Sequence, residues 1–246
     1  MLLIRNRALS HARSAVMDAR LSPTHAHSLS FCTSSVSASE YCIDLVKSAD
    51  FDNYLCGLLI PKPAKRAFFA IRAFNVEIAQ IRDHSNNNFL TGRIRFQYWR
   101  DSIDKIYNSN SNSNSSGSDM GLQPVLQELQ QSIKQHKLTQ RYFERCIEAR
   151  LEDFARSTRT GCYQSLSELE SYAESSQSSL LYLLLETLDT VPARDGEGKG
   201  TVESLRDSKT AHAVSHVGCS FGLMTLLRAF PYHLSQVAGC TCALCA

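Results

Sequence analysis

The chain has 246 residues, of which 43% are hydrophobic and 20% charged, so it can bury a helical core without disulfides or metal. The formal net charge is only +2, and basic residues form no stripe interleaved with aromatics, so nucleic acid is not an expected partner. The nine cysteines are odd in number and scattered, which argues against a disulfide framework. No apolar run approaches the ~20 residues that a membrane-spanning helix needs.

The first forty residues differ in composition from the rest of the chain. Arginines are spread among leucine, alanine and serine, and Asp18 is the only acid before Glu40. An Arg-rich, Ser-rich and acid-poor start is typical of a mitochondrial transit peptide, although a disordered N-terminal tail can have the same composition. We therefore expect residues 1–40 to direct import into mitochondria and to be cleaved between Arg20 and Glu40.

From Tyr41 onward the apolar residues recur at helical spacing, and no stretch alternates with the period of a strand. A turn at Pro61 and Pro63 precedes a helix that is apolar on more than one side, and a second helix covers Gly92 to Tyr107. Residues 108–119 are almost entirely asparagine, serine and glycine, which predicts a disordered insertion.

Helical periodicity resumes after this insertion. Thr139 is a candidate cap for one helix, and Ser165 with Glu168 has the spacing of a capping box for the next. A leucine run ends at Leu188, and the charged, Gly-rich stretch 189–206 is predicted to be a loop. The final helix is expected to run from Ser208 to Phe230 and to stop before Pro231.

Several segments of this helical region resemble the squalene/phytoene synthase family. The segment from Tyr54 to Phe74 contains a Leu-Leu-x-Pro turn, then Arg66, then the pair Ala73-Phe74, as the opening of that family does. Further similar segments are Tyr98-Trp99-Arg100, Gln123-Pro124-Val125-Leu126, Glu168 to Leu181, and His216 to Arg228. The resemblance covers roughly residues 41–234 in family order and spacing. It implies a single all-α domain of isoprenoid-synthase type around a central cavity.

Other sequence segments resemble a mitochondrial, non-catalytic branch of the family that serves the assembly of respiratory complex I. They include Asn53 to Leu59, Arg72 to Glu77, Tyr172 to Tyr182 and Leu227 to His233. The resemblance implies a location on the matrix side of the inner membrane, with peripheral membrane association. It also implies that the partners are complex I subunits or other assembly factors, and that no cofactor is used.

The catalytic members of the family bind Mg²⁺ through aspartates on two facing helices. Mg²⁺ needs several oxygen ligands in octahedral geometry, so carboxylates must project from one helix face. On the first helix the family's three acid positions correspond to Ala79, Gln80 and Asp83, so two acids are lost. Glu77 cannot substitute for them, because six residues place it about 240° around the helix from Asp83.

The second family motif reads Gln-x-x-Asn-x-x-Arg-Asp-x-x-Glu-Asp. The corresponding residues here are Gly222, Thr225, Arg228, Ala229, Tyr232 and His233. Only the arginine remains, and the chain has no Asp or Glu after Asp207. Ala229 and His233 thus mark two further lost acid positions, and we expect neither a bound metal nor prenyl-synthase activity.

Five residues are candidates for a remnant of the family's cavity. Arg66, Arg72 and Arg228 could line a remnant pocket that binds an anion. Alternatively, they could simply pair with Glu77, Asp83 or helix ends. Asp83 is the last family acid, and Tyr172 falls where the family has a cavity tyrosine, although an aromatic at helical spacing is more often a core residue.

Three other groups of polar residues have spacings that resemble those of functional sites. His212 and His216 have the i, i+4 spacing of a zinc pair, but no acid accompanies them, so core or interface histidines are the preferred interpretation. Cys240, Cys242 and Cys245 have metal-like spacing without a second half. Ser176, Ser178 and Ser179 lack the histidine and acid that would activate a nucleophile.

Two alternatives to the assembly role stay open at this point. The chain could bind a prenyl diphosphate or an isoprenoid lipid without turnover, or it could be a residual transferase with other ligands. Binding of a farnesyl diphosphate analogue and Mg²⁺-dependent condensation are the observations that separate these alternatives.

The resemblance stops near Leu234, although the family continues with further helices. Residues 235–246 are rich in Cys, Ala and Gly and are uncharged, so we expect a tail outside the family pattern and a fold whose C-terminal helices are missing. The final helix and the leucine run around Leu183 would then lack a covering layer. An exposed apolar groove is the predicted consequence.

Overall fold

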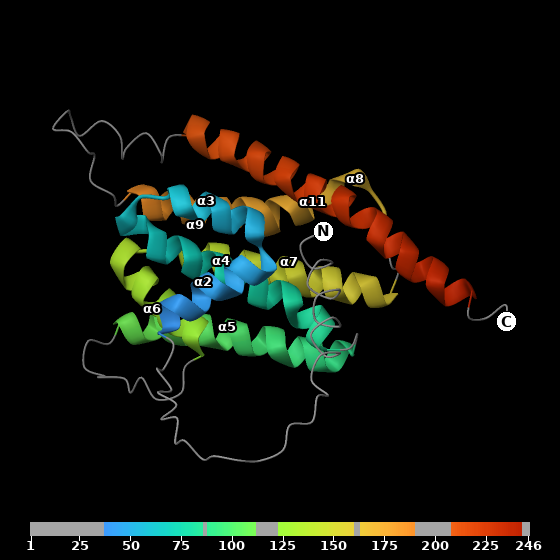
Figure 1. Cartoon of the computed structure of the whole chain (residues 1–246), viewed down its shortest axis with the longest axis horizontal. Helices are drawn as coiled ribbons and strands as arrows, with labels where there is room; N and C mark the ends of the chain where they lie inside the picture. The colour runs from blue at the N-terminus through green and yellow to red at the C-terminus, as the bar shows by residue number, and fades with distance from the viewer. Residues whose placement is uncertain (1–36, 86–87, 112–122, 160–162, 190–207, 243–246) are drawn as a thin grey trace, which may run out of the picture.

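A computed structural model describes residues 37–85, 88–111, 123–159, 163–189 and 208–242, and every element in these ranges is helical (Figure 1). In chain order the helices are α2 (Ala38–Ala49), α3 (Phe51–Leu59), α4 (Lys62–His84), α5 (Phe89–Ser111), α6 (Pro124–His136), α7 (Gln140–Arg159), α8 (Leu166–Ala173), η1 (Glu174–Ser178), α9 (Ser179–Asp189) and α11 (Ser208–Cys242). The all-α prediction is confirmed. None of the helices in the described ranges is long and apolar enough to cross a bilayer.

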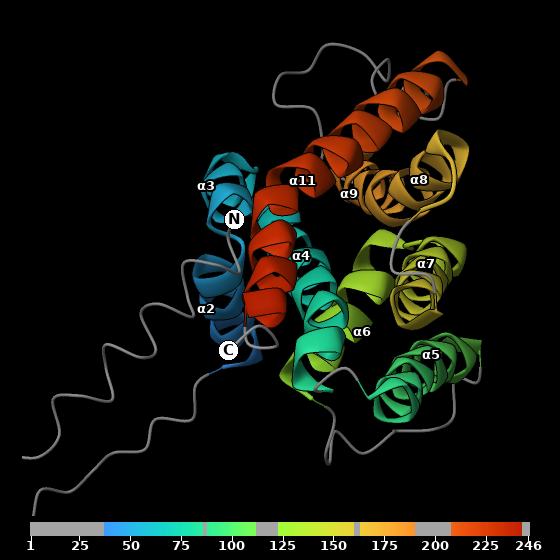
Figure 2. The ribbon, with the colours of Figure 1, turned by 90° about the vertical axis from the view of Figure 1, so that its right-hand side faces the viewer.

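Helix α4 lies at the centre of the bundle, with α2, α6, α7 and α9 packed around it (Figure 2). Its apolar residues occur on all sides, as a central helix requires. Phe74 is fully buried and makes edge-to-face contacts with Trp99 of α5 and Phe143 of α7, at centroid distances of 5.5 and 5.3 Å. This aromatic cluster joins three helices and forms the middle of the core.

The helix starts match the predicted caps only in part, because the hydroxyl of Thr139 donates a 2.5 Å hydrogen bond to Glu186 of α9. Helix α2 begins at Ala38, before the expected start at Tyr41, because Ser37 and Glu40 form a full capping box. Ser165 accepts a hydrogen bond from the amide of Glu168, but the Glu168 carboxylate bonds the amide of Gln164. Residues 1–36 of the predicted transit peptide lie outside the described residues.

Two predicted boundaries were wrong. Helix α5 continues to Ser111, into the predicted insertion, because Asn and Ser cost an established helix only a few tenths of a kcal/mol each. Residues 112–119 and most of the loop at 189–206, from 190 onward, are outside the described part of the chain. Helix α11 runs through Pro231 as far as Cys242, so the predicted tail from residue 235 is partly helical. A proline removes one backbone hydrogen bond, and the neighbouring bonds can carry the helix past it.

Helix α11 lies across the bundle and approaches η1 and α8 very closely (Figure 2). Gly218 and Gly222 make this approach possible. A methyl group on Gly218 would lie 2.3 Å from Ser178 Oγ and 2.5 Å from Ser178 Cα. One on Gly222 would lie 2.7 Å from Ala173 Cβ. The two glycines are also the buried residues among 209–228, so most of the α11 surface is left uncovered.

Candidate functional site

Two of the candidate arginines are engaged in ion pairs. Arg66 donates two hydrogen bonds to Glu128 of α6, of 2.5 and 2.7 Å, and these bonds raise the pKa of its guanidinium. Glu128 is buried, so the ion pair compensates a carboxylate charge whose burial without a partner would destabilise the fold. Arg228 of α11 lies 3.7 Å from the Asp52 carboxylate of α3. Their partners are therefore neither Glu77 nor Asp83.

The side chain of Arg72, in the middle of α4, is buried. Its guanidinium lies 5.7 Å from the centre of the Phe68 ring, and its Nε has no hydrogen-bond partner among the described residues. Burial lowers the pKa of this guanidinium, because the charged form loses its hydration. Arg72 is thus the candidate whose charge is least compensated.

Tyr172 lies at the junction of α7 and α8. Its ring packs 5.8 Å from that of Tyr163, and the guanidinium of Arg150 lies 6.0 Å from its centre. Arg150 also donates a 3.2 Å hydrogen bond to Asn75 of α4. Burial raises the pKa of Tyr172, so its hydroxyl stays protonated at neutral pH. The surroundings of Tyr172 are those of a packing residue.

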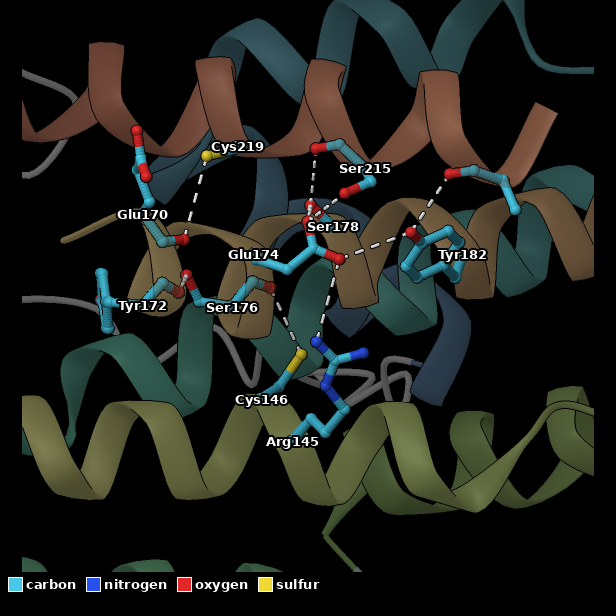
Figure 3. Close-up of polar contacts among 11 residues, drawn as sticks. Arg145, Cys146, Glu170, Tyr172, Glu174, Ser176, Ser178, Tyr182, Ser215 and Cys219 are labelled. Atoms are coloured by element: carbon cyan, nitrogen blue, oxygen red, sulfur yellow. Dashed lines mark hydrogen bonds and ion pairs between the residues drawn. The ribbon is translucent and has the colours of Figure 1, made fainter. Parts of the chain in front are cut away.

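The π-helical turn η1 gathers a polar network that sequence reasoning did not predict (Figure 3). The Glu174 carboxylate accepts hydrogen bonds from Ser178 Oγ at 2.6 Å, Ser215 Oγ at 2.8 Å and Tyr182 Oη at 3.4 Å. Arg145 of α7 lies 3.9 Å from the same carboxylate. The only sequence signal was a short polar string, residues 174–179, within an otherwise leucine-rich helix.

This network ties α7, η1, α9 and α11 together. Ser178 Oγ donates to the Glu174 carboxylate and also lies 3.1 Å from the Ser215 carbonyl, to which it can donate as well. Cys146 donates a hydrogen bond to the Ser176 carbonyl, and burial raises the pKa of its thiol to about 12. A thiol with that pKa is not an activated nucleophile at neutral pH.

His212 and His216 lie on the exposed side of α11, with their Nε2 atoms 3.1 Å apart. A position in the core was therefore the wrong prediction for them, while an interface role stays a prediction. Within the described residues, no three His, Cys, Asp or Glu side chains come together in a way that could hold a metal. The tail cysteines 240, 242 and 245 fall outside the described side chains.

An open apolar groove of about 560 Å³ lies between the end of α9 and the start of α11. It is lined by Ile60, Phe68, Leu181, Leu184, Leu185, Thr187, Leu188, Lys209, Thr210, Ala213, Val214 and Val217. An exposed apolar groove beside the final helix is thus observed, whereas Leu180 and Leu183 of the leucine run are fully buried and not uncovered as predicted. None of the five remnant-cavity candidates lines it, so the groove and those candidates are separate features of the fold.

The squalene/phytoene synthase family model matches residues 46–240. The chain belongs to the squalene/phytoene synthase family. Among curated proteins it is similar to complex I assembly factor 6 of Bos taurus and of Homo sapiens, with 38% and 37% identity over 199 residues. These alignments cover 80% of this chain and 50% of each relative.

A Drosophila melanogaster homolog of that factor is 37% identical over 202 residues, which are 82% of this chain and 53% of the relative. The chain thus spans about half the length of the curated relatives it matches. No solved structure shows a significant match.

The Mg²⁺ that squalene/phytoene synthases use does not fit the donors on α4. Ala79 and Gln80 stand at two acid positions, Asp83 is exposed, and Glu77 accepts a 3.4 Å hydrogen bond from Tyr41. A single exposed carboxylate is too few oxygen ligands for this ion. On α11, Ala229 and His233 lie in the part whose side chains are outside the described set, and the sequence there contains no acid.

Proposed function

We propose that this protein is a non-catalytic mitochondrial factor for the assembly of respiratory complex I. It acts on the matrix side of the inner membrane, by binding complex I subunits or other assembly factors and by peripheral contact with the membrane. The assembly role is supported by the relatives, which are complex I assembly factors 6 and a homolog of that factor. The observation that carries the non-catalytic part is the donor set of α4, where Asp83 stands alone and exposed.

Deletion of the gene is expected to lower the amount of assembled complex I, seen on native gels, while isoprenoid products stay unchanged. Re-expression of the wild-type chain and of an Asp83→Ala variant should restore complex I equally, because the carboxylate does no chemistry. Normal complex I in the deletion strain would refute the assembly role. Rescue by wild type but not by Asp83→Ala would refute the non-catalytic part.

A radiolabelled farnesyl diphosphate assay at saturating Mg²⁺ is expected to yield no condensation product. The physical reason is that the diphosphate leaving group needs metal ions that α4 cannot hold. Asp83→Ala serves as the matched variant. Product formation that disappears in Asp83→Ala would establish a residual transferase and overturn the proposal.

Isoprenoid-lipid binding without turnover is a second candidate, favoured by the apolar groove between α9 and α11. Its volume of about 560 Å³ is within the range of ligand pockets. Saturable binding of a farnesyl diphosphate analogue that is lost in Leu184→Arg would support this second function. Absence of binding would leave the assembly role as the only candidate.

A further inference from the structure

Two imidazole rings meet on the exposed side of α11. His212 and His216 are four residues apart, so they lie on the same face of the helix, one turn from each other. Their Nε2 atoms are 3.1 Å apart, and their ring centres are 4.4 Å apart. Both residues are exposed, and neither lines the apolar groove. Water and dissolved ions therefore have access to a pair of ring nitrogens.

The turn of α11 that carries this pair is held from its inner side. Tyr182 of α9 donates a 3.2 Å hydrogen bond to the Ala211 carbonyl, and Ser178 of η1 lies 3.1 Å from the Ser215 carbonyl. Ser215 itself donates to the Glu174 carboxylate (Figure 3). These contacts fix the backbone beside each histidine against two other elements. A binding pair on such a rigid turn loses little conformational freedom when a ligand binds.

The separation of the two nitrogens suits a metal ion that binds to both. Imidazole nitrogens bind late first-row divalent cations at a distance of about 2.0–2.1 Å. For two nitrogens 3.1 Å apart, this distance gives an N–metal–N angle of about 95–100°. The angle is nearer to the ~90° between neighbouring ligands of tetragonal Cu²⁺ or octahedral Ni²⁺ than to the ~109° of tetrahedral Zn²⁺. The geometry thus favours Cu²⁺ and Ni²⁺.

Metal binding requires one proton to move within the pair. As a hydrogen bond, the contact has a proton on one Nε2 and a lone pair on the other. A metal ion needs the lone pair of both Nε2 atoms, so the proton moves from Nε2 to Nδ1 of the same ring. Both imidazoles stay neutral, and no proton is released. Both then have the Nδ1–H tautomer that leaves Nε2 free to bind a metal.

The donor atoms also decide which ions are excluded. Among the described residues, no third His, Cys, Asp or Glu joins the pair in a way that could hold a metal. This part of the chain therefore supplies two nitrogens, and water can take the remaining positions. Mg²⁺ prefers oxygen ligands, so two imidazoles are a poor site for it. The pair is thus distinct in chemistry from the carboxylate sites of the catalytic family members.

We propose that His212 and His216 bind a late first-row divalent cation, with Cu²⁺ and Ni²⁺ preferred to Zn²⁺. The ion links two successive turns of α11 and so adds to the hydrogen bonds that hold this part of the helix from inside. Binding to the folded helix stabilises it, because the unfolded chain does not keep the two rings together. The proposal does not rest on the role in complex I assembly.

The test titrates the full chain with Ni²⁺ and follows the histidine ring signals by NMR. Ni²⁺ is paramagnetic, so the signals of His212 and His216 should broaden at lower Ni²⁺ concentrations than those of other histidines. The two single variants, His212→Gln and His216→Gln, identify the signals. Each variant should weaken Ni²⁺ binding by about tenfold or more, because one of the two protein ligands is lost. Excess Mg²⁺ should not compete.

Ser220 allows a matched test of the spacing, because it is exposed and lies four residues after His216. Ser220→His in the His212→Gln protein rebuilds an i, i+4 pair and should restore Ni²⁺ affinity to within about threefold of wild type. Val217→His in the His216→Gln protein places the second ring about 140° around the helix from His212 and should not restore it. Val217 is exposed as well, so both variants are expected to fold, and circular dichroism verifies this.

The tail cysteines need a control of their own, because their spacing is also metal-like. The triple variant Cys240→Ser, Cys242→Ser, Cys245→Ser should keep the Ni²⁺ effect on His212 and His216. Loss of Ni²⁺ binding in the triple variant, with unchanged binding in His212→Gln, would assign the metal to the cysteines and overturn the proposal.

The proposal is also overturned if Ni²⁺ does not broaden the two ring signals, or if Ser220→His gives no rescue. Sedimentation velocity should show a monomer with bound Ni²⁺. A Ni²⁺-dependent dimer that is lost in His212→Gln would place the ion between two copies instead of within one helix, and would refute the site as proposed. None of these measurements involves complex I, so their failure is distinguishable from failure of the assembly role in the deletion strain.

Discussion

Phe74→Ala is expected to lower the free energy of unfolding by about 3–5 kcal/mol, as large-to-small changes at fully buried aromatic sites do. Phe74 is fully buried at the centre of α4 and contacts both Trp99 and Phe143 edge to face. The substitution removes the ring and leaves a cavity, because the three helices around it cannot all move inward to fill the space. Chemical denaturation followed by circular dichroism measures the change.

Leu59→Ala is the matched control for Phe74→Ala. Leu59 is also a large apolar residue in a helix, but it is 87% exposed, so its truncation should change stability by less than about 0.5 kcal/mol. Equal losses in the two variants would contradict the central position of α4. A large loss in Leu59→Ala alone would mean that the side chain of Leu59 is covered in solution.

Gly218→Val is expected to lower the free energy of unfolding by about 2–3 kcal/mol and to loosen α11. The new Cβ would lie 2.5 Å from Ser178 Cα, and a backbone atom cannot move aside as a flexible side chain can. Helix α11 must therefore shift away from η1, which also stretches the hydrogen bonds that Ser215 donates to Glu174 and accepts from Ser178. Thermal unfolding and limited proteolysis within α11 report the two effects.

Ser220→Val places the same side chain on an exposed position of the same helix, so it controls for helix propensity. It should leave both stability and proteolysis nearly unchanged. Gly222→Val is expected to act like Gly218→Val, because its Cβ would approach Ala173 to 2.7 Å. If Gly218→Val were as stable as Ser220→Val, α11 would not pack on η1 through its glycines.

The candidate residues show where reasoning from sequence reached its limit. The sequence alone indicated that Asp83 is the one family acid position on α4 that is still an acid. That prediction depends only on which residue stands at each helical position. It did not indicate that Arg66 would bind Glu128, 62 residues away on another helix. It also did not indicate the Glu174 network, because Ser215 and Arg145 reach that carboxylate from helices that are remote in sequence.

The sequence by itself determined the helical class, the position of most helices and the family. These properties depend on local periodicity, caps and ordered motifs, and each of these signals lies within a short segment of the sequence. The tertiary structure alone decided the end of α5, the passage of α11 through Pro231, the π-helical turn and the residues that line the groove between α9 and α11. Each of these depends on which surfaces meet across the bundle, and burial against a distant helix can outweigh a local preference of about 1 kcal/mol.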